Sequence, residues 1–137
     1  MRSCLTLGTL AMTVAVAGCA HLSSTTPTAS GEESSDYLTA NVVRVSEEYA
    51  NINTDVSGTQ LSAWGVGHQQ LFTVKFKSHT VQPMLGKDYS DVPRGEWIAL
   101  IEEDGMLQLA ISFGHAATEI GCSVGDTLYI QSPNQGE

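Results

Sequence analysis

Residues 96–131 decide the fold, and they read EWIALIEEDGMLQLAISFGHAATEIGCSVGDTLYIQ. The Asp104-Gly105 pair lies between two apolar runs. This pattern predicts a β-hairpin closed by a type I′ turn, because both central residues of such a turn need φ > 0. After the pair, large apolar residues occupy every second position, as on the inward face of a strand. That face is expected to consist of Leu107, Leu109, Ile111 and Phe113.

A short helix and a last strand follow the hairpin. Gly114 ends the second strand, and two alanines within residues 115–120 favour a helix, which Gly121 is placed to end. A final strand is expected over residues 127–131.

Upstream apolar runs extend the β pattern toward the N-terminus. Four further strands are expected over residues 41–46, 49–56, 70–78 and 80–85. Pro83 restricts the last of them to a sheet edge or a bulge, because proline has no N–H to donate.

Two connections complete the prediction. Residues 61–67 are interpreted as a loop or single helical turn that covers one end of the sheet. Residues 92–95, Val-Pro-Arg-Gly, suit a type I turn with proline second and glycine fourth. About seven short strands and one short helix in about 95 residues predict a small antiparallel barrel or sandwich. The fold class is therefore all-β, with the domain over residues 38–131 and a tail over 132–137.

The N-terminus has the features of an export signal. Arg2 is followed by a weakly apolar run over residues 5–17 and by Val16-Ala17-Gly18-Cys19. The run is shorter than the roughly 20 apolar residues that cross a bilayer. The ending resembles the lipobox of bacterial lipoproteins, which implies removal of residues 1–18 and lipidation of Cys19. Ala20 after the cysteine, rather than Asp, implies the outer membrane in a cell with two membranes.

Residues 19–37 are rich in Ser and Thr and almost devoid of apolar side chains, so we expect a flexible tether. Of the three cysteines, Cys4 leaves with the signal and Cys19 carries lipid, which leaves Cys122 without a partner for an intramolecular disulfide. Cys122 itself is interpreted as a small apolar filler. We expect a cell-envelope protein, anchored to the membrane by lipid and facing the periplasm.

The formal net charge is −9. Acidity of this size argues against nucleic acid as a partner. A metal site is not expected either, because His21, His68 and His79 lack ligand spacing with one another or with carboxylates. We expect no cofactor.

Several motifs occur in a fixed order between residues 41 and 130. They are Tyr49-Ala50-Asn51 with Thr54, Tyr89 before Pro93-Arg94-Gly95, Gly105-Met106-Leu107-Gln108-Leu109-Ala110, Gly114-His115-Ala116-Ala117, and Gly125-Asp126. Their order and spacing resemble the C-terminal domain of the S-adenosyl-methionine hydroxide adenosyltransferases, a family related to the fluorinating and chlorinating adenosyltransferases. The resemblance implies a seven-stranded antiparallel barrel.

The resemblance also bears on catalysis. In that family a larger N-terminal domain activates the nucleophile, and the active site lies where it meets the C-terminal domain of a neighbouring subunit. We find no counterpart of the larger domain in this sequence, so we expect a domain that is not an enzyme by itself. The chain also departs from the family motifs, which predicts a retained scaffold with a rebuilt rim. The departures are Ala50 for Gly, Glu103 and Asp104 for small polar residues, Gln108 for Glu, and His115 for Asn or Ser.

The candidate ligand-binding residues are Asn51, Tyr49, Gln108 and His115. The resemblance implies that Asn51 faces an adenine, while Tyr49 or Tyr89 would supply a stacking surface. Gln108 and His115 would add polar groups. For His115 the alternative is that it caps or shields the end of the helix.

Three functions remain open from the sequence. The first is a binding or interaction module for a small nucleoside-like ligand or for an envelope protein. The second is half of an enzyme completed by a separate partner. The third is a structural envelope protein without a ligand. The sequence leaves the oligomeric state open.

Overall fold

The computed structural model describes residues 36–135, which belong to the second of the chain's two units, residues 35–137. The predicted signal peptide, Cys19 and the tether as far as Ser35 lie outside the described residues. Within residues 36–135, none of the helices is both long enough and apolar enough to span a bilayer.

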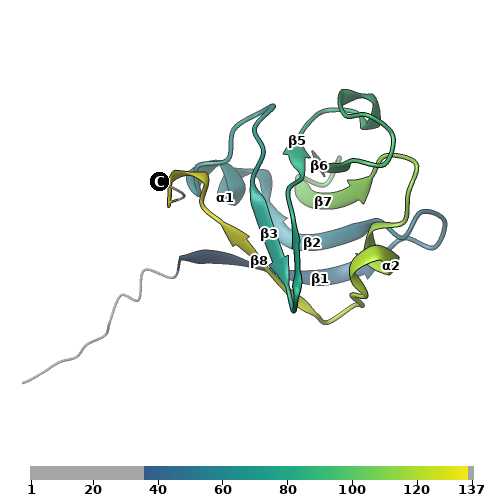
Figure 1. Ribbon diagram of the computed structural model, residues 1–137. Helices are drawn as coiled ribbons and strands as arrows, with labels where there is room; N and C mark the ends of the chain where they lie inside the picture. The colour runs from purple at the N-terminus through teal and green to yellow at the C-terminus, as the bar shows by residue number, and fades with distance from the viewer. Residues whose placement is uncertain (1–35, 136–137) are drawn as a thin grey trace, which may run out of the picture. The chain divides into compact units, whose positions relative to one another are not determined.

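One eight-stranded sheet forms the domain, so the predicted all-β class is confirmed (Figure 1). The strands are β1 (Tyr37–Val45), β2 (Ile52–Ser57), β3 (Thr73–Phe76), β4 (His79–Val81), β5 (Met84–Leu85), β6 (Trp97–Ile101), β7 (Met106–Ile111) and β8 (Thr127–Gln131). Their order is β4-β3-β8-β1-β2-β7-β6-β5, and every pair is antiparallel except β5 with β6. The helical elements are α1 (Gly58–Ala63), α2 (Ala116–Ile120) and the 3-10 turns η1 (Tyr89–Asp91) and η2 (Pro133–Gln135).

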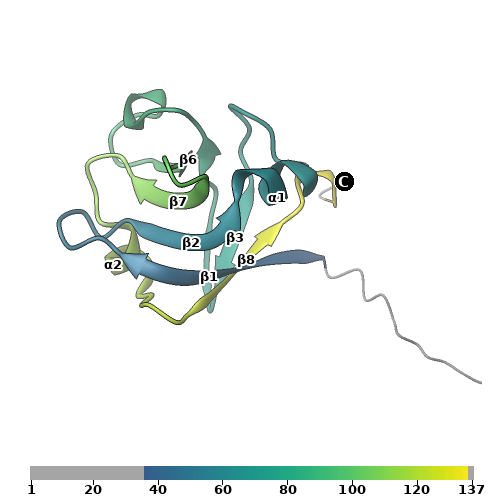
Figure 2. The same ribbon diagram turned by 180° about the vertical axis from the view of Figure 1, so that it is seen from behind.

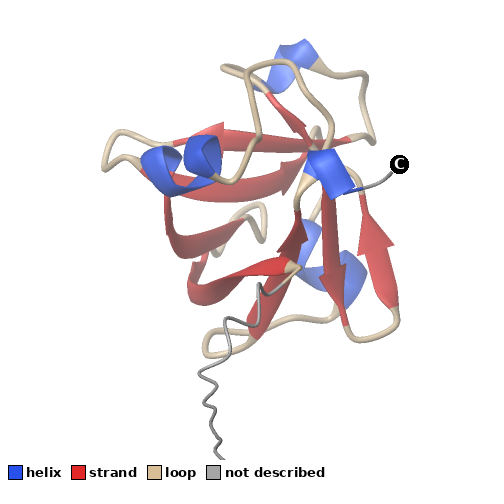
Figure 3. Ribbon diagram, turned by 90° about the vertical axis from the view of Figure 1, so that its left-hand side faces the viewer, coloured by secondary structure: helices blue, strands red, loops and turns tan. Residues whose placement is uncertain are grey.

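The segment after β3 brings the two ends of the sheet together. The Phe72 N–H donates to the Pro83 carbonyl at 3.1 Å, and the Leu85 N–H donates to the Gln70 carbonyl at 3.0 Å. On its other side, Met84 of β5 pairs with Ile98 of β6. The sheet therefore curls into a small barrel, as Figure 3 shows.

The number of strands differs from the prediction at Pro83. A single strand over residues 80–85 was wrong, because the ladder is interrupted at Gln82 and Pro83 and resumes as β5 with a different partner. A proline cannot donate to the ladder, which is why the strand divides there.

The hairpin of β6 and β7 forms in the predicted place but with a different turn. The Glu102 N–H donates to the Met106 carbonyl at 2.9 Å, and the Gly105 N–H donates to the Glu102 carbonyl at 2.8 Å. Gly105 has φ 81, whereas Asp104 is not in the left-handed region. The loop is thus a three-residue connection ending in a left-handed glycine, and the predicted type I′ turn was wrong.

The turn before β6 also differs from the prediction. Its hydrogen bond runs from the Glu96 N–H to the Pro93 carbonyl at 3.1 Å, which makes Pro93 the first residue and Gly95 the third. Gly95 has φ 89, as the third residue of a type II turn does. The predicted type I turn over residues 92–95 is therefore shifted by one residue.

The two helices lie at opposite ends of the barrel (Figure 2). α1 begins at Gly58, earlier than predicted, because Ser57 and Gln60 form a capping box. Trp64 follows α1 and donates its indole N–H to the Ile130 carbonyl at 3.0 Å. α2 agrees with the prediction, and Gly121 ends it at φ 70.

β7 is buried on both faces. Leu107 and Leu109 lie in the main core, while Ala110 packs with Ile98 and Leu100 in a second cluster against Val92. A polar residue on the second face must therefore find partners inside the protein, which applies to Gln108.

Candidate functional site

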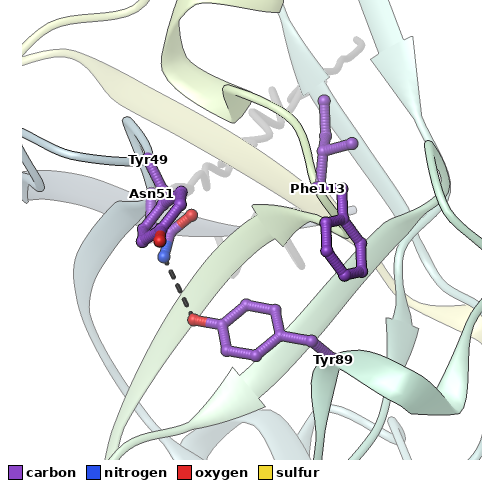
Figure 4. Close-up of a pocket in the computed structure, with 5 residues that line it drawn as sticks. Tyr49, Asn51, Tyr89 and Phe113 are labelled. Atoms are coloured by element: carbon purple, nitrogen blue, oxygen red, sulfur yellow. Dashed lines mark hydrogen bonds between the residues drawn. The ribbon is translucent and has the colours of Figure 1, made fainter.

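A cavity of about 360 Å³ lies between the loop after β1, η1 and the end of β7. Its lining residues are Tyr49, Asn51, Tyr89, Ile111 and Phe113. Figure 4 shows Tyr49 and Asn51 on one side, Phe113 on the other, and Tyr89 reaching in between them. Three aromatic rings from three separate segments thus surround one space.

The loop between β1 and β2 positions Tyr49 and Asn51. Ala50, between them, has φ 50, and its carbonyl accepts from the Ala117 N–H of α2 at 2.8 Å. The Asn51 N–H donates to Ser46 Oγ at 2.9 Å. The predicted strand over residues 49–56 was wrong at its start, because the chain leaves β1 at Val45 and re-enters the sheet at Ile52. These contacts hold the loop against α2 and turn its side chains toward the cavity.

η1 carries Tyr89 into the cavity. Asp88 precedes the turn, and its carboxylate accepts from the Ser90 N–H at 2.9 Å. The backbone hydrogen bond from Ser90 lowers the pKa of Asp88. Asp91 Oδ2 in turn accepts from the backbone N–H groups of Lys87 and Asp88. Two carboxylates therefore fix the short turn on which Tyr89 sits.

A chain of hydrogen bonds fixes the polar side of the cavity. Gln108 Nε2 donates to Glu102 Oε1 at 2.6 Å and to the Tyr89 hydroxyl oxygen at 3.0 Å. The same hydroxyl oxygen accepts from Asn51 Nδ2 at 3.1 Å. Because the Glu102 carboxylate can only accept here, it sets the orientation of the Gln108 amide, and Gln108 in turn positions Tyr89.

One acceptor of this network has no partner. Asn51 is 6% exposed, and its Oδ1 makes no hydrogen bond within residues 36–135. An unpaired buried carbonyl costs about 1–3 kcal/mol.

Phe113 lies at the rim in a strained conformation. It is 76% exposed and has φ 60, and it occupies the turn in which the Gly114 N–H donates to the Ile111 carbonyl at 3.0 Å. The predicted inward position of Phe113 was wrong, because the strand ends at Ile111 and the alternation ends with it. The turn brings the ring to the cavity mouth instead of the core.

The tyrosine at the mouth keeps its proton. A hydrogen bond with the Glu48 side chain raises the pKa of Tyr49 above its ordinary value of 10.0. At neutral pH the Tyr49 ring is therefore an uncharged stacking surface.

The structure brings most of the sequence-predicted residues together. Asn51, Tyr49 and Tyr89 line the cavity, and Gln108 lies behind them, bonded to Tyr89. His115 is exposed at the N-cap of α2, lies outside the cavity lining, and makes no side-chain hydrogen bond that caps the helix. Within residues 36–135, the His115 side chain therefore makes no contact that supports either predicted role, as a polar group of the site or as a cap of the helix.

Sequence reasoning missed Phe113 and Glu102. Glu102 is not among the predicted site residues, yet its carboxylate accepts a hydrogen bond from the buried Gln108 amide. The sequence feature that could have indicated this role is Gln108, because a buried side-chain amide needs hydrogen-bond partners. The next two acidic residues, Glu103 and Asp104, line a second and more polar cavity of about 370 Å³. Within residues 36–135 there is no group of His, Cys, Asp or Glu side chains able to hold a metal ion.

The chain matches a family model over residues 40–129, that of the SAM (S-adenosyl-methionine) hydroxide adenosyltransferase C-terminal domain. Among solved structures, an uncharacterized conserved protein from Thermotoga maritima aligns with a TM-score of 0.66 at 20% identity. A conserved hypothetical protein from Thermus thermophilus aligns with a TM-score of 0.50 at 16% identity. Each alignment covers 70% of this chain and 36% of the other, so the chain spans about a third of their length. No curated protein matches the chain.

Proposed function

The chain belongs to the SAM hydroxide adenosyltransferase C-terminal domain family, and from this premise we propose that it is a binding module for a small nucleoside-like ligand. The observation that carries the proposal is the cavity between Tyr49, Tyr89 and Phe113. Its volume of about 360 Å³ is within the range of small-molecule sites, at the lower end. The proposed role is binding, without catalysis by this domain alone.

The chemistry of the lining supports a planar ligand with a polar edge. Aromatic side chains stack on nucleobases, with about 1–3 kcal/mol per base. The Asn51 side chain adds a polar group to the cavity lining. The hydrogen bonds from Glu102 through Gln108 to Tyr89 keep this arrangement in place before a ligand arrives.

The test is calorimetric titration of the full chain with adenosine. We expect saturable binding that weakens about tenfold or more in Tyr49→Ala, since one stacking surface is removed. Tyr129→Ala is the matched control, because Tyr129 is a similarly exposed tyrosine on β8, outside the cavity. No binding at millimolar adenosine, or equal affinity in the two variants, would refute the proposal.

A second part of the proposal concerns location. We propose that Cys19 carries lipid and anchors the domain to the envelope membrane, supported by the Val-Ala-Gly-Cys ending and the polar segment behind it. Cys19→Ser should leave the membrane fraction or accumulate unprocessed. Native protein recovered in the soluble fraction with Met1 still attached would contradict this.

An enzymatic role is the second candidate. It is favoured by the lengths of the solved relatives, because the matched part is 36% of the Thermotoga maritima chain. The domain would then complete an active site with a larger partner domain. Incubating the full chain with S-adenosyl-methionine and measuring adenosine by chromatography separates the two functions. Adenosine above the uncatalysed background, lost in Asn51→Ala, would favour the enzyme.

A further inference from the structure

The turn that contains Arg94 is tied to the rim of the cavity. The Gly95 N–H donates to the Ser112 carbonyl at 2.8 Å, and the Ser112 N–H donates to the Glu96 carbonyl at 3.0 Å. Both bonds join the turn to the residue just before Phe113. The backbone of Arg94 therefore has a defined position beside the Phe113 ring.

The guanidinium of Arg94 lies over that ring, with its Cζ 4.1 Å from the ring centroid. This cation–π contact is the one interaction of the guanidinium within residues 36–135. Its N–H donors, five in all, thus have no acceptor there. Arg94 is not part of the cavity lining, so its charge lies next to the cavity, against the Phe113 ring.

We infer that Arg94 binds an anionic group of the ligand, so that the ligand is an aromatic compound carrying a phosphate or a carboxylate. The inference rests on the proposed function, in which the ligand ring stacks inside the cavity. An anionic group that extends from that ring past Phe113 can then meet the guanidinium, which lies on the Phe113 ring. Arginine binds both phosphate and carboxylate through paired N–H donors.

Because the whole protein is acidic, the Arg94 guanidinium is important for binding an anionic ligand. With a formal net charge of −9, the protein repels anions at long range. Salt at physiological strength screens that repulsion beyond about 8 Å. Within residues 36–135 the Arg94 guanidinium has no carboxylate partner, so its positive charge beside Phe113 favours an anionic ligand locally.

The test compares adenosine with adenosine 5′-monophosphate, titrated into the full chain. We expect the monophosphate to bind about tenfold more tightly, a difference typical of one charge-assisted contact at the surface, and to lose most of this advantage at 0.5 M NaCl. In Arg94→Gln the advantage should disappear while adenosine affinity stays within about twofold. Lys77→Gln is the matched control: it removes the same charge and a cation–π contact, with Phe76, outside the cavity.

The outcomes separate this inference from the proposed function. Adenosine that binds as tightly as the monophosphate would overturn the role of Arg94 and leave the binding module standing. An advantage that persists in Arg94→Gln, or is lost equally in Lys77→Gln, would also overturn it. Absence of binding by both compounds would refute the proposed function and this inference with it.

Discussion

Two residues with φ near +60° show how the same backbone strain can serve different ends. Gln69 has φ 64 and Phe113 has φ 60, a conformation that costs an L-residue about 1–2 kcal/mol. Gln69 is exposed in a loop, whereas Phe113 forms the rim of the cavity. Strain of this kind persists where the surrounding structure imposes it, and it is frequent at binding sites.

Gln69→Gly should stabilise the protein, because glycine adopts this conformation without steric cost. The gain is about 0.5–1 kcal/mol, since the flexibility of glycine in the unfolded chain offsets part of the relief. Gln69 uses its backbone N–H for a hydrogen bond to the Leu85 carbonyl at 2.7 Å, which glycine keeps. Urea denaturation measures the change. His68→Gly is the control, and it should destabilise, because His68 is exposed and does not have positive φ.

Individual residues also show which parts of the site could be predicted from the sequence and which could not. Asn51, Tyr49 and Tyr89 were identified because they match family motifs, and all three line the cavity. Phe113 was not, because strand alternation assigned it to the core and the end of the ladder at Ile111 depends on pairing with β6. The position of His115 depends on where α2 docks, which sequence spacing does not determine.

At the scale of elements, local sequence signals predicted the hairpin and the helix, although not the turn types, whereas the long-range pairing was not predicted. The hairpin of β6 and β7 and the helix ending at Gly121 follow from neighbouring residues, and both are present. The parallel pairing of β5 with β6 joins residues 84–85 to 98–99. No periodicity in the sequence encodes that pairing, so the closure of the barrel was accessible only through the resemblance to a family.

The pair β1 and β2 supplies a prediction about acid. Asn41 Nδ2 donates to Asp55 Oδ2 at 2.8 Å and the Asn41 N–H donates to Oδ1 at 2.8 Å, next to the irregular register after Val42. The side-chain hydrogen bond is the main cause of the lowered pKa of Asp55. A lowered folded-state pKa means that this stabilisation is present above the unfolded value and is lost as pH falls through the folded value.

The parent chain should therefore lose more stability between about pH 5 and pH 3 than Asp55→Asn, which has no proton to bind there. The measurement is urea unfolding at pH 6, 4 and 3. Glu119→Gln is the control, because Glu119 is exposed on α2 and its side chain makes no hydrogen bond in the described part of the chain. Identical pH dependence in the parent chain and Asp55→Asn would contradict the assignment.

At the scale of the whole molecule, β1 determines where the folded domain starts. Tyr37 pairs with Gln131, and its hydroxyl accepts from Lys75 Nζ at 3.0 Å. Tyr37 also packs edge-on against Tyr129, with ring centroids 6.2 Å apart. The strand thus joins β8 over the five residue pairs from Tyr37–Gln131 to Asn41–Thr127 before it pairs with β2.

A chain that starts at Asp36 should fold and melt within a few degrees of the full chain, because it keeps every described contact of β1. A chain that starts at Asn41 loses Ala40 and Leu38, which pack in the core, and most of the pairing with β8. Burial of such side chains contributes roughly 1.5–3 kcal/mol for a leucine, and each kcal/mol shifts the melting temperature of a domain this size by about 4–8 °C. We therefore expect the shorter chain to melt more than 10 °C lower, by circular dichroism. A large loss already in the chain from Asp36 would show that residues before it stabilise the barrel.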